Sequence, residues 1–271
     1  MITLTLKEQP SVPLEAEVLS PDVMAELSND DIRALPVYLG KRQRRLDDFF
    51  NVEGAASEEL AIHGDAAKVK WIGREMTRGR ISITGNVGMH LGAYMTGGSI
   101  EVSGSASDWV GAEMSGGVIR LGGNAGGQVG AAYRGSVSGM RDGTILIGGG
   151  AGLEVGMRMK RGIIAIRGPV RDFTGLQMKG GTIILGSGAE LRTGAWMMRG
   201  TIITLRRIPL MPTFSYAATY MPPFVRLYAR HLETLGFTIP CEERDGAYQR
   251  YTGDTSVPGK GEILVWTPRG S

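Results

Sequence analysis

Short apolar segments recur at a regular interval through the middle of the chain. Each is three residues long, begins with isoleucine and is rich in β-branched side chains, as in Ile100-Glu101-Val102. Alternation of apolar and polar positions over so short a stretch predicts a β-strand rather than an amphipathic helix. The six segments are Ile81–Ile83, Ile100–Val102, Ile119–Leu121, Ile145–Ile147, Ile164–Ile166 and Ile183–Leu185.

Glycines between these segments define the repeat. We call them the anchor glycines: Gly73, Gly92, Gly111, Gly130, Gly156, Gly175 and Gly194. They follow one another with a constant 19-residue period, except at the step from Gly130 to Gly156, which is seven places longer. A fixed period of this size indicates a solenoid, and the unit is too short for a pair of packed helices. Each unit is therefore predicted to contain strands joined by glycine corners.

The predicted fold is all-β: a parallel, right-handed β-helix of about seven coils. Equivalent residues of successive coils would stack about 4.8 Å apart. Glycine is expected at the corners because it enters positive-φ conformations without a steric penalty from Cβ.

An apolar position lies three places after each anchor glycine. It holds methionine in six units and Tyr133 in the seventh, the methionines being Met76, Met95, Met114, Met159, Met178 and Met197. We predict an internal ladder in which Tyr133 substitutes once. A stack of thioethers could hold Cu(I), but methionine is more often a filler of irregular core space, and we favour that interpretation.

The long interval after Gly130 equals one period plus seven residues. We place the surplus around Ser136–Asp142. Insertions in repeat proteins leave the stack as surface loops, often on the binding face. This loop is therefore predicted to touch a partner.

The repeat divides the chain into three predicted parts: an N-terminal α/β cap at 1–59, the β-helix at 60–205 with its insertion near 136–142, and a C-terminal loop, helix and tail at 206–271. Caps are expected because the end strands of a solenoid would otherwise present free backbone groups. The C-terminal helix should run from Pro223 to Leu235 and stop before Gly236. Its apolar positions 224, 225, 228, 232 and 235 form one face that could lie against the coils.

Composition narrows the class of protein. The 271 residues are 42% hydrophobic and carry a formal net charge of +3, which is weak evidence for nucleic-acid binding. No apolar stretch approaches the roughly 18 residues of a membrane span, and the start lacks a signal-peptide core. We expect a cytoplasmic protein without nucleic-acid or membrane partners. The single cysteine, Cys241, supports neither an internal disulfide nor an iron–sulfur site.

Five basic residues follow the methionine position by one or two places: Arg134, Lys160, Arg161, Lys179 and Arg199. If equivalent positions stack, they line one edge of the later coils. They could simply keep an exposed sheet edge soluble. Alternatively, they form a docking stripe for an acidic partner or a polyanionic ligand.

No catalytic, cofactor-binding or metal-ligating set is visible in the sequence. The three histidines are far apart and form neither an HxH nor an HExxH pair. We interpret His63-Gly64-Asp65 as a turn rather than a base with its orienting acid, and His90 as an exposed corner residue. No GxSxG or GxxxxGK[ST] motif occurs.

The repeats carry a GxxGxxxG motif at Gly85–Gly92, Gly123–Gly130 and Gly149–Gly156. This motif resembles the β-helix shared by the C subunit of formylmethanofuran dehydrogenase and the C-terminal domain of the glutamate synthase large subunit. The flanking segments are more similar to the C subunit, especially that of the bacterial formyltransferase/hydrolase complex: Phe49–Gly54, Pro209–Phe214, Tyr251–Asp254 and Gly259–Glu262.

The resemblance implies a non-catalytic scaffold subunit in tetrahydromethanopterin-linked oxidation of formaldehyde to formate. Its implied partners are the A, B and D subunits, which are amidohydrolase-like, similar to the metal-pterin subunit of the dehydrogenase, and a formyltransferase, respectively. Metal and a furan-type one-carbon carrier, methanofuran or a relative of it, would belong to those partners. The archaeal tungsten or molybdenum dehydrogenase and a glutamate-synthase-like protein are the alternatives. A carbohydrate-active β-helix enzyme would need clustered carboxylates, whereas Glu101, Glu113, Glu154 and Glu190 are scattered.

Overall fold

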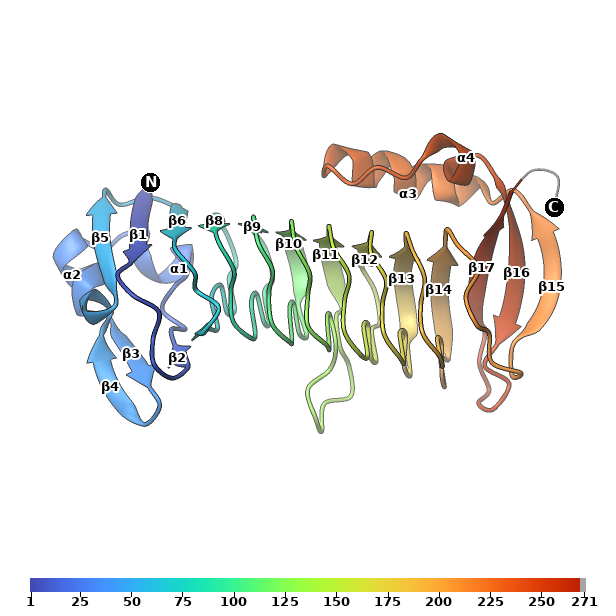
Figure 1. The fold of residues 1–271 in the computed structure, drawn as a ribbon, viewed down its shortest axis with the longest axis horizontal. Helices are drawn as coiled ribbons and strands as arrows, with labels where there is room; N and C mark the ends of the chain where they lie inside the picture. The colour runs from blue at the N-terminus through green and yellow to red at the C-terminus, as the bar shows by residue number, and fades with distance from the viewer. Residues whose placement is uncertain (269–271) are drawn as a thin grey trace.

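A row of parallel strands forms the body of the protein (Figure 1). The computed structural model describes residues 1–268. Ten strands run parallel in one large sheet: β1 (Ile2–Leu6), β6 (Glu59–His63), β8 (Arg80–Thr84), β9 (Ser99–Val102), β10 (Ser115–Leu121), β11 (Asp142–Ile147), β12 (Ile163–Ile166), β13 (Lys179–Leu185), β14 (Arg199–Thr204) and β17 (Gly261–Thr267). The protein is thus mostly sheet, as predicted for the all-β class.

Antiparallel strands close both ends of this sheet. At one end, β5 (Phe50–Gly54) pairs with β1. At the other end, β16 (Ala247–Gly253) pairs with β17, and β15 (Ser215–Tyr220) pairs with β16. The stack therefore continues beyond the 19-residue repeats, because β1 and β17 come from the non-repeating ends and still extend the parallel register.

A second line of contacts joins successive repeats on another side. Single-residue parallel bridges connect Ala66, Val87, Ala106, Ala125, Ala151, Val170 and Ala189 in order. These small residues and the inward side chains of the strands enclose one continuous apolar core. Each repeat therefore packs chiefly on the repeat before it and the repeat after it.

The methionine ladder is present, but Tyr133 is not part of it. Met140 is fully buried like the other six methionines, whereas Tyr133 is only partly buried. The Lys160 amide donates a hydrogen bond to the Met140 carbonyl at 2.8 Å. The Lys179 amide donates to the Met159 carbonyl in the same way, at 2.7 Å, so Met140 and Met159 occupy equivalent positions. The insertion therefore comprises residues 133–139, three positions earlier than predicted, and a thioether rather than a phenol fills the core position.

A helix covers the outer face of the later strands. α3 (Pro223–Thr234) buries Val225, Ala229 and Leu232, and it packs on the strand residues Leu146, Ala165, Ile184 and Ile203. Figure 1 shows it lying over this part of the row, and the short helix α4 (Cys241–Arg244) follows it. The apolar face predicted for the helix is thereby confirmed, and Gly236 follows its end at φ 78°.

The N-terminal segment contains a smaller sheet with strand order β4-β3-β2-β7. Its strands are β2 (Leu14–Glu15), β3 (Pro36–Leu39), β4 (Arg42–Arg45) and β7 (Val69–Lys70). Two helices, α1 (Pro21–Met24) and α2 (Asn29–Ala34), follow serine N-caps, and the 3₁₀ helix η1 spans Leu46–Asp48. None of the helices described between residues 1 and 268 is long and apolar enough to span a membrane.

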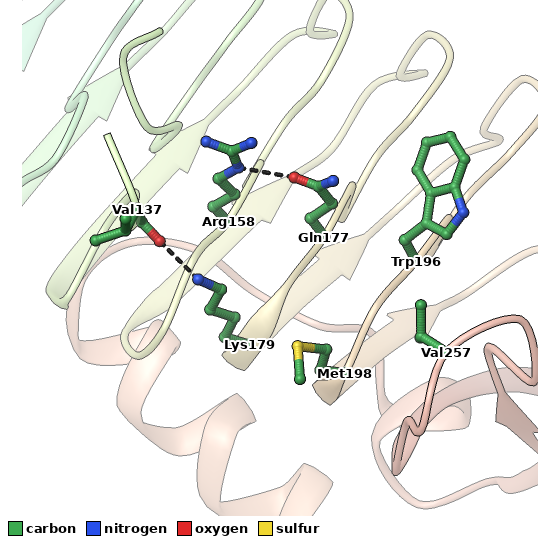
Figure 2. Close-up of a pocket in the computed structure, with 7 residues that line it drawn as sticks. All are labelled: Val137, Arg158, Gln177, Lys179, Trp196, Met198 and Val257. Carbon is green, nitrogen blue, oxygen red and sulfur yellow. Dashed lines mark hydrogen bonds between the residues drawn. The ribbon is translucent and has the colours of Figure 1, made fainter. Parts of the chain in front are cut away.

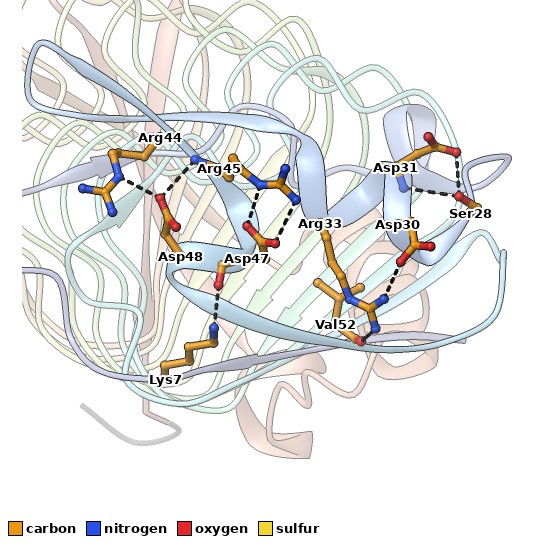
Figure 3. A network of polar contacts seen from close by, with 10 residues as sticks. All are labelled: Lys7, Ser28, Asp30, Asp31, Arg33, Arg44, Arg45, Asp47, Asp48 and Val52. Atoms are coloured by element: carbon orange, nitrogen blue, oxygen red, sulfur yellow. Dashed lines mark hydrogen bonds and ion pairs between the residues drawn. The ribbon is translucent and has the colours of Figure 1, made fainter.

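Basic side chains in this N-terminal sheet are locally neutralised (Figure 3). Arg44 Nε lies 2.7 Å from Asp48, and Arg45 Nη2 lies 2.9 Å from Asp47. Hydrogen bonds from these arginines lower the pKa of both carboxyl groups. Two of the four basic residues between Lys41 and Arg45 are therefore paired with carboxylates. The end of the predicted C-terminal tail, residues 269–271, lies outside the described residues.

Candidate functional site

The corners that carry the anchor glycines also hold non-glycine residues in the left-handed conformation. One row lies two positions before the glycines, at Trp71, His90, Trp109, Gln128, Glu154, Phe173 and Arg192. A second row lies two positions after them, at Glu75, Tyr94, Glu113, Arg158, Gln177 and Trp196. Together with the insertion 133–139, these rows define what we call the corner face.

This backbone conformation is unfavourable by about 1–2 kcal/mol per non-glycine residue. It persists here because most of these amides donate a hydrogen bond to a carbonyl of the next repeat. For example, the His90 amide donates to the Asp108 carbonyl at 3.0 Å, and the Trp109 amide donates to the Gly127 carbonyl at 2.9 Å. A concentration of left-handed residues with large side chains is uncommon and marks the corner face as the candidate site.

Aromatic rings stack on the first half of the corner face. The rings of Trp71 and His90 lie 4.0 Å apart and nearly parallel. Tyr133, the first residue of the insertion, stacks on Trp109 with a centroid distance of 4.7 Å. Its hydroxyl lies 2.8 Å from His90 Nδ1, and its amide donates to Glu113 Oε1 at 2.9 Å. The insertion is thus fastened to earlier repeats by its first residue.

Burial in this cluster shifts the pKa values of two residues. Burial and the nearby charge of Lys70 lower the pKa of His90 to about 4, while Asp108 opposes the shift. Burial raises the pKa of the Tyr133 phenol. At neutral pH the imidazole is therefore uncharged, and its Nδ1 can accept a hydrogen bond from the Tyr133 hydroxyl. The prediction that His90 is exposed is wrong, because neighbouring repeats and the insertion cover its ring.

A groove lies on the second half of the corner face, beyond the insertion (Figure 2). It has a volume of about 520 Å³ and is lined by Val137, Arg158, Gln177, Lys179, Trp196, Met198 and Val257. A neighbouring hollow shares Lys179 and Met198 and adds Arg199, Pro258 and Lys260. We call the two together the cationic groove. Its walls come from the insertion on one side and from residues 257–260 near the C-terminus on the other.

The basic side chains near the insertion are held by neutral oxygen atoms. Lys179 Nζ donates to the Val137 carbonyl at 2.7 Å. Arg158 donates to the Ser136 carbonyl at 2.6 Å through Nη1, and to Gln177 Oε1 at 2.7 Å through Nε. These bonds fix the positions of the two cations but do not neutralise their charge.

In the structure, four of the five predicted basic residues occupy two neighbouring positions of the later repeats. Lys160 and Lys179 directly follow buried methionines, and Arg161 and Arg199 come one place later. Arg134 is not among them, because it lies in the insertion, where it lines a separate 320 Å³ hollow with Trp109 and Glu154. Arg141 takes its place in the row, since its amide donates to Met114 as that of Lys160 donates to Met140.

The groove residues that sequence reasoning missed include Arg158, Trp196, Met198 and Lys260. Arg158 and Trp196 lie two positions after anchor glycines, so that position in each repeat could have been examined for outward-facing side chains. Lys260 had no such signal, because a segment far beyond the last repeat brings it to the groove. Within residues 1–268, no cluster of three or more His, Cys, Asp or Glu could hold a metal ion.

One solved chain is similar to this protein along nearly its whole length. It is a chain in the X-ray crystal structure of the formyltransferase/hydrolase complex (FhcABCD) from Methylorubrum extorquens in complex with methylofuran. The two are 33% identical with a TM-score of 0.90, and the match covers 97% of this chain and 98% of the other. No family model matches the sequence.

Curated relatives match over a shorter segment. The C subunit of tungsten-containing formylmethanofuran dehydrogenase 2 from Methanothermobacter thermautotrophicus is 46% identical over 97 residues, which are 34% of this chain and 36% of the relative. The C subunit of molybdenum-containing formylmethanofuran dehydrogenase 1 from Methanothermobacter marburgensis is 43% identical over 91 residues, 33% of this chain and 23% of the relative. The chain thus spans about a third or less of the length of these relatives.

Proposed function

Because the chain belongs to the family formed by the C subunits of formyltransferase/hydrolase complexes and formylmethanofuran dehydrogenases, we propose that it is a non-catalytic scaffold subunit of a formyltransferase/hydrolase complex. The observation that carries this proposal is the likeness at TM-score 0.90 over 97% of the chain. In this role it would organise three partners: an amidohydrolase-like subunit, one related to the metal-pterin subunit of the dehydrogenase, and a formyltransferase.

The architecture that suits this role is the parallel β-helix. Strand registers that advance by one 19-residue period, such as Ile81 on Ile100 and Ile164 on Ile183, support it, as does the second line of bridges from Ala66 to Ala189. A solenoid presents long surfaces made of equivalent residues, on which large partners can dock without rearrangement. The three-part division at 59/60 and 205/206 stays a prediction within this proposal.

The chemistry would belong to the partners. In this proposal the formyl group passes between tetrahydromethanopterin and a furan-type carrier on other subunits, and the metal also lies there. The corner face of this chain is suited to binding, because it offers aromatic faces and fixed cations. Arg134, Lys160, Arg161, Lys179 and Arg199 stay predicted contacts to a partner or to an anionic carrier tail, and the cytoplasmic location stays a prediction.

A second candidate function is that of the C subunit in an archaeal-type tungsten or molybdenum formylmethanofuran dehydrogenase. The 46% identity over 97 residues favours it locally, whereas the match to the formyltransferase/hydrolase complex extends along almost the whole chain. We therefore rank it second.

The proposal is tested by tagging this chain in its native host and analysing the purified assembly by native mass spectrometry. We expect one complex that contains the formyltransferase and the amidohydrolase-like subunit, with neither formyl transfer nor formate release by the isolated chain. A tungsten- or molybdenum-bearing partner would favour the second candidate. Recovery of the chain alone, or catalysis by it, would contradict the scaffold role.

A further inference from the structure

We propose that the cationic groove binds an acidic, extended segment of a partner subunit. This inference rests on the proposed function, since it requires a partner, and it adds the place and the chemistry of one contact. The groove lies on the regular repeats, and its two walls, the insertion 133–139 and residues 257–260, come from the regions where the 19-residue period fails.

Uncompensated charge is the first observation. The residues that line the cationic groove include Arg158, Lys179, Arg199 and Lys260, and no carboxylate. Throughout residues 1–268, thirteen arginines have ion-pair partners, as Arg192 has Asp172, yet none of these four basic residues has one. The same holds for the neighbouring Arg141, Lys160 and Arg161 within the described chain. Clustered positive charge without counter-charges favours an anionic occupant.

Exposed apolar side chains between the cations are the second observation. Trp196 is 48% exposed, Met198 44% and Val137 71%. Tryptophan, methionine and arginine are enriched at protein–protein interfaces, and tryptophan and arginine often dominate their energetics. A simple inorganic anion would leave these apolar surfaces uncovered. A polypeptide with carboxylates and at least one apolar side chain would cover both kinds of surface.

The groove is held in place by hydrogen bonds before any partner binds. The Trp196 amide donates to Asp254 Oδ2 at 2.9 Å, and this carboxylate is buried. The Lys260 amide donates to the Met198 carbonyl at 2.7 Å. Across the groove, Lys179 is fixed by the Val137 carbonyl. Prior fixing of the contact residues reduces the entropy lost on binding, which suits a site for an otherwise flexible segment.

Spacing favours an extended segment. Lys160 and Lys179 occupy the same position in adjacent repeats, so their backbones lie about 4.8 Å apart. An extended chain advances about 3.3 Å per residue and directs alternate side chains to the same side. Carboxylates on one side of such a segment would be about 6.6 Å apart, and the long side chains of lysine and arginine can span the difference from the repeat spacing.

Two other macromolecular occupants fit less well. A second copy of this chain docked by twofold symmetry would bring the same cationic surfaces together, because an isologous contact uses one patch on both subunits. Single-stranded nucleic acid is bound by rows of aromatic side chains on which bases stack. The groove instead has one indole between aliphatic side chains.

A zero-length carbodiimide cross-link tests the chemistry directly in the purified complex, because it joins a lysine amine to a carboxylate in contact with it. We expect peptides in which Lys160, Lys179 or Lys260 is joined to Asp or Glu in an acidic segment of another subunit. Failure of all three lysines to link while other lysines of the chain do, or linkage to a second copy alone, would overturn the proposal. Protection of these lysines by co-purifying nucleic acid, lost on nuclease treatment, would do the same.

Charge reversal supplies an independent test. Lys179→Glu with Lys260→Glu should weaken binding of this chain to the remaining subunits at least tenfold near 0.1 M salt. The difference should shrink at 1 M salt, where the screening length falls to about 3 Å. Lys41→Glu with Arg42→Glu is the matched control, because both residues are exposed and lie far from the groove; its affinity should equal that of the wild type.

The two tests separate the outcomes. If the wild-type chain does not assemble with other subunits, the proposed function fails. If the wild type assembles and the Lys179/Lys260 variant binds equally well while its thermal unfolding is unchanged, the scaffold role stands and the groove proposal is wrong. Trp196→Ala covers the case in which charge reversal prevents folding, because it removes the exposed indole without changing charge and should also weaken binding.

Discussion

The Tyr133 hydroxyl lies 2.8 Å from His90 Nδ1, although the two residues are 43 positions apart. Tyr133 begins the insertion, and His90 lies on the corner of an earlier repeat. The contact therefore ties the insertion to the body of the protein. Because burial and Lys70 keep the imidazole neutral, the strength of this tie should depend on pH.

Acidification should destabilise the protein through His90. The pKa of His90 is about 4 in the folded protein and 6.5 ordinarily. Above about pH 6.5 the residue is neutral in both states. Between 6.5 and 4 the unfolded chain takes up a proton that the folded chain does not, so stability falls as the pH falls. The midpoint temperature of thermal unfolding should therefore fall more steeply between pH 7.5 and pH 4.5 for the wild type than for His90→Gln. Equal slopes for the two would contradict the prediction, and His231→Gln, on the exposed side of α3, is the control.

Deleting residues 133–139 should restore an uninterrupted period and leave the fold intact. The strands on either side pair in register, with Ile119 opposite Ile145, and Met140 would then follow Ala132 directly. We expect an unchanged far-UV circular dichroism spectrum and reversible unfolding, with loss of binding to the partner subunits because one wall of the cationic groove is gone. A chain that fails to fold would show that the insertion is part of the stack.

Replacing an anchor glycine should be more damaging than replacing a glycine of the same backbone geometry elsewhere. Gly111 and Gly40 have φ values of 59° and 60°. A Cβ on Gly111 would lie 2.5 Å from Ile145 Cδ1, whereas one on Gly40 meets nothing within 4 Å. Gly111→Ala should lower the free energy of unfolding by about 1–3 kcal/mol more than Gly40→Ala, because it overpacks the core. Chemical denaturation of both variants measures the difference; equal losses would mean that backbone strain alone matters.

Truncation on the buried side of α3 should destabilise the protein by about 2–5 kcal/mol, the usual range for a core leucine. Leu232→Ala removes a fully buried side chain that packs on the outer face of the strands. Leu227 lies on the same helix but is 66% exposed, so Leu227→Ala should change stability by less than about 0.5 kcal/mol. If both variants unfold at the same denaturant concentration, α3 does not contribute to the stability of the sheet.

The repeating part of the fold could be predicted because its signals are local. Strand segments, corner glycines and the apolar face of α3 are all set by neighbouring residues, and each is found in the structure. The hairpin of β3 and β4 was missed, since its second strand, Arg42–Arg45, is a basic run without apolar alternation.

The position of the insertion was ambiguous in the sequence. Counting one period forward from Met114 gives Tyr133, and counting one period back from Met159 gives Met140. Both residues are large and apolar enough for the position, so spacing cannot decide between them. Packing does: the thioether is fully buried, while the phenol stays at the surface, where its hydroxyl can be satisfied.

The cationic groove could not be predicted as a unit. Lys179 and Arg199 were recognised by their place in the repeat, but Val137 and Val257, which line the opposite walls, are far apart in the sequence. Their proximity depends on how the insertion and the C-terminal segment fold back. Neither belongs to the periodic pattern, so no sequence spacing specifies where they meet.

Because antiparallel strands close both ends of the sheet, the number of repeats between them can change without a change in either end. Between β5 and β16, each 19-residue unit contributes one parallel strand and adds about 4.8 Å to the row. A duplication or loss of one unit would leave both terminal structures chemically unchanged and alter just the separation between them. In evolution, the separation of the two terminal structures could thus be adjusted in fixed increments by copying or deleting the stretch of gene that encodes one unit.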